Sequence, residues 1–503
     1  MEAPVMEAPE LPADPDRSES HAAATKRGVA WSSVGRAAIQ VVQFGSGLVL
    51  ARLLSPTEFG VMASLGVVSS FAILLFEMGL SSVLVAKRQP TEADFATVFW
   101  VNAISGVLFF ALLSAIGPLI GSFFHQPVIS SLAPIVGLAF LVNLGVCQQA
   151  VLTRALRFKE IAVIETIAAV LNFGTVIVLA VLGVGVYSLA IGPVVGSAAT
   201  SALLWWLVPW RPRHFISLSS WRSIWKYSGP LLGFNVVNYW SRNADNLMIG
   251  RVLGAGSLGF YNRGYNLMLL PVTQLAQVLG RVMFPVFTAM RDEPGRAGSA
   301  YRRVVRILNL VSVPILAGMA AVAPGLVPFL WGHQWLPTVP ILIVLCLAGI
   351  PQSLATTVGW IYQSHEATGR QFWTGTTFAV FNVAAMAIGL HWGAVGVGTG
   401  LLISSWIGLL PVLDYATRLI GVRATRVLLD TLPTWVVGAV MFVCVRELPR
   451  VLGASAENGA VLALQVALGG CLYVGGVALL QRSALTEFWL AVRPRSSASG
   501  ADA

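Results

Sequence analysis

The sequence has little charge and few cysteines. Asp, Glu, Lys and Arg make up 11% of its 503 residues, whereas a soluble globular chain carries about 25%. The composition therefore excludes an ordinary soluble domain. The four cysteines lie far apart inside apolar segments, which predicts neither a disulfide framework nor a metal site. We interpret them as small buried hydrophobic residues: Cys147, Cys346, Cys444 and Cys471.

The motifs of covalent chemistry are also missing. The sequence has no phosphate-binding glycine loop, no His and Cys cluster at metal-ligand spacing, and no large loop that could hold a transferase or polymerase site. We therefore expect no enzyme, no metal and no cofactor. His125 and His333 fall in short predicted turns beside Phe124 and Trp335, where anchoring at the membrane interface is the simpler interpretation.

Apolar residues dominate what is present. They make up 56% of the chain, and the mean hydropathy is +0.76. A helix needs about 20 apolar residues to cross roughly 30 Å of hydrocarbon, and about fourteen such segments occur, which predicts an all-α, polytopic membrane protein. The expected spans are 29–51, 59–85, 95–122, 128–152, 161–183, 186–208, 227–250, 257–286, 304–330, 336–362, 372–391, 394–416, 428–445 and 459–481.

The basic residues indicate the topology. With both termini on the cytoplasmic side, 24 of the 32 Lys and Arg residues fall in cytoplasmic segments, four fall in outer loops and four lie inside helices. This asymmetry follows the positive-inside rule. The net charge of +10 is thereby explained by topology, so we expect no nucleic-acid partner. We expect a multi-pass protein of the plasma (inner) membrane.

Two halves of the chain resemble each other. The stretch Arg52–Gly60 aligns with Arg251–Gly259, Ala169–Asn172 aligns with Ala379–Asn382, and Gly185–Leu189 aligns with Gly396–Gly400. An even number of helices in each copy makes the repeats parallel, related by an axis along the membrane normal. We therefore predict two parallel six-helix repeats that form two lobes, followed by a C-terminal helix pair.

The predicted domain limits follow from these spans. The Pro-rich, acidic start has no apolar periodicity and predicts disorder. Trp210, Trp221 and Trp225 indicate an interfacial helix over residues 215–226. The expected parts are a disordered cytoplasmic tail (1–28), an N-lobe (29–208), an interfacial linker (209–226), a C-lobe (227–416), the helix pair (428–481) and a cytoplasmic tail (482–503).

Polar side chains form stripes along three predicted helices, at the spacing of one helical face. Ionised side chains at the bilayer centre cost roughly 2.5–3.5 kcal/mol, so these faces should line a water-filled cavity rather than meet lipid. Guanidinium groups bind phosphate through two oxygens at once, so the cavity suits an anionic, hydroxyl-rich substrate. The expected substrate-binding residues are Arg36, Gln43, Asn235, Asn238, Arg242, Asn246, Arg263, Gln274, Gln277 and Arg281.

Two acids stand out in this set of helices, Glu77 and Asp245. Asp245 either pairs with Arg242 and holds helices together or takes part in ion coupling. Glu77 either pairs with Arg36 or Arg281 or binds a coupling proton or cation. The sequence leaves both alternatives open.

Several motifs resemble a known family. The motifs are Leu50–Gly60, Glu77–Ser82, Asn243–Gly254, Leu258–Arg263 and Phe284–Phe287. They are similar to those of Wzx-type polysaccharide flippases, which belong to the multidrug/oligosaccharidyl-lipid/polysaccharide exporter superfamily. The resemblance covers roughly residues 26–485, and 243–263 is its most specific part.

The resemblance implies two six-helix lobes around a cationic central cavity. It also implies a flippase that moves an undecaprenyl-diphosphate-linked oligosaccharide across the plasma membrane by alternating access. The product would serve capsule, exopolysaccharide or O-antigen (lipopolysaccharide) synthesis. The expected partners are this lipid-linked oligosaccharide and the bilayer, with the polysaccharide polymerase and export machinery as further candidates. Two alternatives are a cation-coupled multidrug exporter of the same architecture and a membrane glycan polymerase or ligase.

Overall fold

A computed structural model describes residues 21–77, 84–85, 87, 89–217, 220–221, 236, 239–240, 242–291 and 293–481. Most of the described residues are helical, and the length and composition of many of these helices are those of membrane spans. Ten helices are long and apolar enough to cross a membrane, or up to twelve if each of two bent helix pairs counts as one span. The expected all-α polytopic class is confirmed. Half of the expected span 227–250 lies outside the described residues, and its last part, 242–250, is helical.

The chain divides into two compact units, Met1–Gly259 and Phe260–Ala503. The division falls inside one long helix, α10. The described helices of unit 1 are α1 (His21–Leu53), α2 (Pro56–Glu77), α4 (Glu92–Phe123), α5 (Ile129–Val142), α6 (Val146–Arg154), α7 (Phe158–Val181) and α8 (Val186–Leu207). Helix α1 begins at His21, so the tail expected to be disordered over 1–28 is helical from that residue onward.

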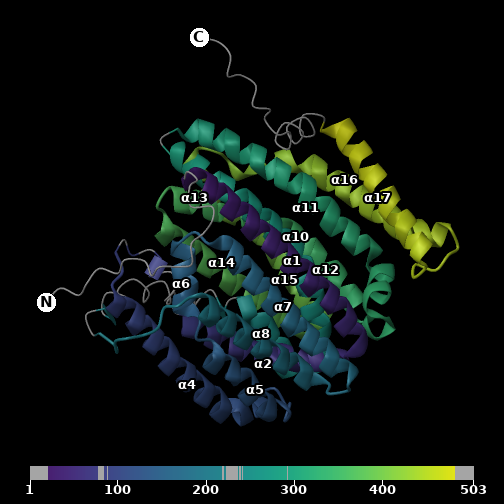
Figure 1. Ribbon diagram of the computed structural model, residues 1–503. Helices are drawn as coiled ribbons and strands as arrows, with labels where there is room; N and C mark the ends of the chain where they lie inside the picture. The colour runs from purple at the N-terminus through teal and green to yellow at the C-terminus, as the bar shows by residue number, and fades with distance from the viewer. Residues whose placement is uncertain are drawn as a thin grey trace. The chain divides into compact units, whose positions relative to one another are not determined.

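Unit 2 begins within α10 (Gly254–Ala289). Its other α-helices are α11 (Pro294–Trp331), α12 (Thr338–Ala355), α13 (Val358–Ser364), α14 (Thr368–Gly389), α15 (Gly393–Thr417), α16 (Ala424–Val451) and α17 (Gly459–Leu480). Short 3-10 turns lie at His333–Trp335, Leu390–Trp392 and Arg418–Ile420. In Figure 1 the last two helices, α16 and α17, lie beside each other next to α11.

The same succession of helices occurs in both units. A long helix (α4 or α11) is followed by a broken pair (α5 and α6, or α12 and α13) and then by two packed helices (α7 and α8, or α14 and α15). Residues with positive φ occur at equivalent turns of the two units. Leu156 precedes α7 and Glu366 precedes α14. Gly185 lies directly before α8, and Gly393 is the first residue of α15. Gly393 therefore corresponds to Gly185, and the expected match of Gly185–Leu189 with Gly396–Gly400 is out of register by three residues.

The span expected at 128–152 is bent. Helices α5 and α6 meet at 45°, and side chains bind the main chain exposed at the break. Asn102 Nδ2 donates to Asn143 O at 2.8 Å, and Trp205 Nε1 donates to Leu144 O at 2.9 Å. Ser201 Oγ accepts from Leu144 N at 3.1 Å. Backbone groups at membrane depth must find partners inside the protein, and these side chains supply them.

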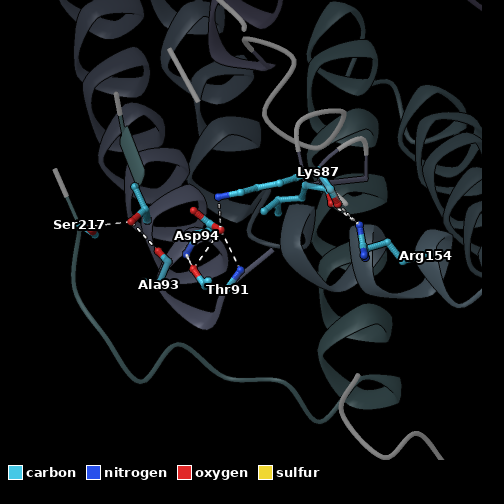
Figure 2. Close-up of polar contacts among 8 residues, drawn as sticks. Lys87, Thr91, Ala93, Asp94, Arg154 and Ser217 are labelled. Carbon is cyan, nitrogen blue, oxygen red and sulfur yellow. Dashed lines mark hydrogen bonds and ion pairs between the residues drawn. The ribbon is translucent and has the colours of Figure 1, made fainter. Parts of the chain in front are cut away.

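Side-chain caps define the start of α4. Thr91 and Asp94 form a capping box, which satisfies main-chain N–H groups at the helix start. Lys87 Nζ lies 2.6 Å from Asp94 Oδ2. Arg154 Nη1 donates to three carbonyls of the preceding segment, including that of Lys87 at 2.8 Å. Figure 2 shows both groups of contacts.

The linker after α8 docks on α4. Ser217 N donates to Thr97 Oγ1 at 3.0 Å (Figure 2), and Trp100 stacks on Phe215 with ring centroids 5.0 Å apart. Residues 208–217 are not helical, so the interfacial helix expected from residue 215 does not begin there. Helix is assigned at Ser220 and Trp221, and residues 222–226 lie outside the described part. Hydrogen bonds and an aromatic contact, rather than a continuous helix, hold this segment on α4.

The C-terminal pair packs into unit 2. Tyr473 Oη of α17 donates to Leu310 O of α11 at 3.0 Å. Arg302 of α11 binds both carboxylate oxygens of Asp430 in α16, at 2.5 and 2.9 Å. Because α11 begins at Pro294, ahead of the expected residue 304, Arg302 is helical rather than part of a loop. The pair therefore anchors on the basic start of α11.

Candidate functional site

Helix α1 presents two of the predicted binding residues on its surface. Arg36 and Gln43 are both exposed. A side chain at Gly35 would lie 2.7 Å from Ala162 Cβ, so α1 and α7 cross closely at this point. Glu165 follows Ala162 by one helical turn and interacts electrostatically with Arg36. The structure thus places a carboxylate near the first predicted phosphate ligand.

Glu165 is a residue that the sequence analysis missed. Only Glu77 and Asp245 were singled out as acids in the helices of this set, although Glu165 lies inside the expected span 161–183. An acid within an apolar span is the signal that could have identified it. Glu77 ends α2 and is exposed. Within the described residues, no ion pair joins Glu77 to Arg36.

The segment after Ser241 carries the central part of the predicted stripe. Arg242 is exposed, whereas Asp245 is 4% exposed. Asp245 Oδ1 accepts from Asn246 N at 2.8 Å, and the Asn246 side-chain oxygen is buried. No ion pair between Arg242 and Asp245 occurs among the described residues, so pairing does not account for Arg242 here. Asn235 and Asn238 lie outside the described residues.

The same segment packs within unit 1. Tyr239 Oη donates to Val67 O of α2 at 2.5 Å. Phe71 of α2 contacts Trp240, with ring centroids 5.0 Å apart. At the other end, Arg251 Nη1 donates to Phe123 O at 2.6 Å. Contacts at both ends therefore hold the segment of Arg242 on α2 and α4.

Helix α10 carries the remaining predicted ligands. Gln274 and Gln277 are exposed. The Arg263 guanidinium lies over the rings of Trp331 and Trp335, with its central carbon 5.7 and 5.8 Å from their centroids. Arg263 therefore has an aromatic environment in addition to its predicted binding role. The side chain of Arg281 lies outside the described part.

The two repeated turns of the sequence contact each other within unit 1. A side chain at Gly60 would lie 1.7 Å from Ala255 O, and a side chain at Gly259 would lie 1.9 Å from Pro56 O. In the alignment of Arg52–Gly60 with Arg251–Gly259, Pro56 corresponds to Ala255 and Gly60 to Gly259. The contact is thus reciprocal. We name it the glycine crossing: Pro56, Gly60, Ala255 and Gly259.

These groups favour binding over bond-making. Exposed Arg36 and Arg242 offer guanidinium forks for an anion, and exposed Gln43 offers an amide donor and acceptor. Among the described residues, no group of three or more His, Cys, Asp or Glu residues could hold a metal ion. Guanidinium and amide groups are the side chains that suit an anionic, hydroxyl-bearing molecule.

Comparisons with known proteins identify the family. A model of the family described as "Polysaccharide biosynthesis protein" matches residues 49–340. The chain is 28% identical to teichuronic acid biosynthesis protein TuaB of Bacillus subtilis over 76% of this chain and 78% of that protein. It is 26% identical to lipopolysaccharide biosynthesis protein WzxC of Escherichia coli, with 75% and 78% covered. It is 25% identical to succinoglycan biosynthesis transport protein ExoT of Rhizobium meliloti, with 94% and 97% covered.

Solved structures show the same fold. The lipid II flippase MurJ in its inward closed conformation matches with a TM-score of 0.74, 16% identity, and 90% of this chain and 99% of that chain covered. An inward-facing multidrug resistance MATE transporter matches with a TM-score of 0.59, 17% identity, and 76% and 95% covered. The chain therefore belongs to the polysaccharide biosynthesis family of Wzx-type transporters, and it is a multi-pass membrane transporter rather than an enzyme.

Proposed function

We propose that the protein is a flippase that moves an undecaprenyl-diphosphate-linked oligosaccharide from the cytoplasmic to the outer leaflet of the plasma membrane. The product would serve capsule, exopolysaccharide or O-antigen synthesis. The names of the relatives support this, since they concern teichuronic acid, lipopolysaccharide and succinoglycan. The fold shared with a lipid II flippase supports it further.

The exposure of Arg242 carries the proposal. A charge at mid-membrane depth costs roughly 2.5–3.5 kcal/mol unless water or a counter-charge offsets it. Arg242 is exposed and has no ion pair among the described residues, whereas Asp245 one turn away is buried. A diphosphate is a counter-charge that arrives with the substrate. Arg36 is another predicted binding residue of unit 1 whose guanidinium is exposed, and both would bind the diphosphate.

The other predicted residues take roles in the same proposal. Gln43, Asn235, Asn238 and Asn246, with Gln274 and Gln277 of α10, would bind sugar hydroxyls, and Arg263 and Arg281 would add positive charge. Transport would proceed by alternating access, in which each state is favoured by different contacts with the cargo. We further propose fourteen transmembrane helices, in two six-helix repeats and a final pair, with both termini in the cytoplasm.

Substitution of Arg242 tests the proposal. Arg242→Ala should abolish export of surface polysaccharide while the protein stays inserted and abundant. Arg242→Lys should restore export only in part, because an ammonium group lacks the fork that binds two phosphate oxygens. The matched control is Arg450→Ala, since Arg450 is an exposed residue paired with Glu447 at 2.8 Å.

A double substitution separates cargo binding from structural pairing. If Arg242 only balances Asp245, then Arg242→Asn combined with Asp245→Asn should export normally, because both charges are removed together. Normal export by that double variant, or by Arg242→Ala alone, would assign this arginine to structure and refute the anionic-cargo proposal. Loss of export in both variants, with normal export by the control, supports it.

A further inference from the structure

Arg251 is the first residue of the second repeated turn, Arg251–Gly259. Its guanidinium contacts the turn between α4 and α5. Its Nη1 donates to Phe123 O at 2.6 Å and lies 3.0 Å from His125 Nδ1 and 2.8 Å from His125 Nε2. The guanidinium also lies over the Phe123 ring, 5.1 Å from the centroid. All of these residues belong to unit 1.

The chemistry of this contact depends on the protonation state of His125. Nη1 lies at nearly the same distance from both ring nitrogens, so the cation lies over the imidazole ring, and such a contact is attractive when the ring is neutral. A protonated imidazole carries the same charge as Arg251, so the contact becomes repulsive. His125 is exposed, and histidine changes charge in the physiological pH range. The charged side chain that the structure shows bound to His125 is that of Arg251.

The backbone of His125 closes the turn after α4. His125 has φ of 54°, a left-handed conformation in which histidine is enriched among the residues other than glycine. The N–H groups of His125 and Gln126 donate to the carbonyls of Ser122 and Gly121 at 3.3 and 2.8 Å. These hydrogen bonds hold His125 at the position where its ring contacts Arg251.

The contact bears directly on the glycine crossing. Arg251 begins the turn that carries Ala255 and Gly259, the two residues that approach Gly60 and Pro56. Between Arg251 and the crossing, Gly250 packs against Phe124, since a side chain there would lie 2.9 Å from the Phe124 ring. The α4–α5 turn therefore holds the repeated turn in the position that closes the crossing.

We propose that Arg251 and His125 form an acid-sensitive latch, in which neutral His125 holds the glycine crossing closed and protonated His125 releases it. The latch rests on the proposed function in one respect, because the proposed topology places both residues on the outer face. Acid outside the cell would then loosen the glycine crossing of unit 1.

A buried cysteine below the crossing reports its opening. Ser64 is fully buried one turn after Gly60 on α2, and Ser64→Cys is nearly isosteric. The background is Cys444→Ser with Cys471→Ser, because these two native thiols are exposed. The rate of modification by a membrane-impermeant thiol reagent is measured in right-side-out and in inverted vesicles, at about pH 8 and about pH 5.5, on either side of the histidine range.

The control variants separate the latch from general pH effects. His125→Asn places a neutral acceptor where Nδ1 lies and tolerates the left-handed backbone, so it keeps the contact at every pH. His125→Gly removes the contact and suits the backbone. The rate for the His125 protein is divided by the rate for His125→Asn, which cancels the pH dependence of thiol reactivity common to both.

The expected result is a rate ratio near one at the higher pH that rises about tenfold at the lower pH, as for loss of one attractive contact between a cation and a ring. His125→Gly should be modified faster than His125→Asn at both pH values, with a ratio independent of pH. A ratio for the His125 protein that does not change with pH would overturn the proposal. This assay contains no cargo, so the pH response should persist when Arg242→Ala is added. A pH response without export would contradict only the proposed function, and export without a pH response would contradict only the latch.

Discussion

Adding one methyl group at Gly60 should force the glycine crossing apart. The new Cβ would lie 1.7 Å from Ala255 O, an atom of the main chain that no rotamer change can move. The helices that carry Gly60 and Ala255 must therefore separate. Overpacking a tight contact by one such group costs about 1–3 kcal/mol, and each 1.4 kcal/mol is about a tenfold change in population. We expect the ratio of closed to open molecules to fall about 5- to 150-fold in Gly60→Ala.

The same helix provides the matched control. Gly66 also lies in α2, and nothing lies within 4 Å of a Cβ built there. Gly66→Ala makes the same change in composition and in helix propensity, without a clash. The assay is the modification rate of Ser64→Cys, which should rise in Gly60→Ala and stay unchanged in Gly66→Ala. Equal rates in the two variants would show that the crossing does not control access to Ser64, and would refute the reasoning.

Three further predictions concern packing and charge. Asn102→Leu leaves the carbonyl at the α5–α6 break without its donor and should lower stability by about 1–3 kcal/mol, seen as a lower Tm in detergent; an unchanged Tm would contradict this. Arg302→Ala should lower Tm less, because Asp430 and its partner are partly exposed, and a loss larger than that of Asn102→Leu would be inconsistent. Glu165→Gln should tighten binding of a prenyl diphosphate, because Arg36 loses a competing negative charge; a titration showing unchanged or weaker binding would exclude such competition.

Hydropathy alone predicted most of the helices, because any apolar segment of sufficient length is stable in lipid, whichever helices lie beside it. The helices α7, α8, α14, α15 and α17 lie within a few residues of their expected spans. The ends of other helices depend on polar contacts between exposed side chains, and a hydropathy profile does not predict these contacts. Helix α11 continues to Pro294 beyond the apolar stretch, because partners such as Asp430 bind its basic first turns.

The break between α5 and α6 was not predicted because its causes are remote in sequence. Asn102 and Trp205 come from other helices and bind the carbonyls of Asn143 and Leu144. These partners cannot be identified from the sequence around the break. The same reason explains Glu165, which stands beside Arg36 only because α1 and α7 cross at Gly35.

The sequence by itself determined that the chain is a membrane-embedded helical protein and that Arg52–Gly60 is repeated at Arg251–Gly259, since composition and self-similarity are local properties. Only the tertiary structure decided that the two copies touch through Gly60 and Gly259. It also decided that Arg242 is exposed while Asp245 is buried, although both lie on one predicted stripe. Burial and contact depend on which helices pack together, and residues distant in the chain determine that packing.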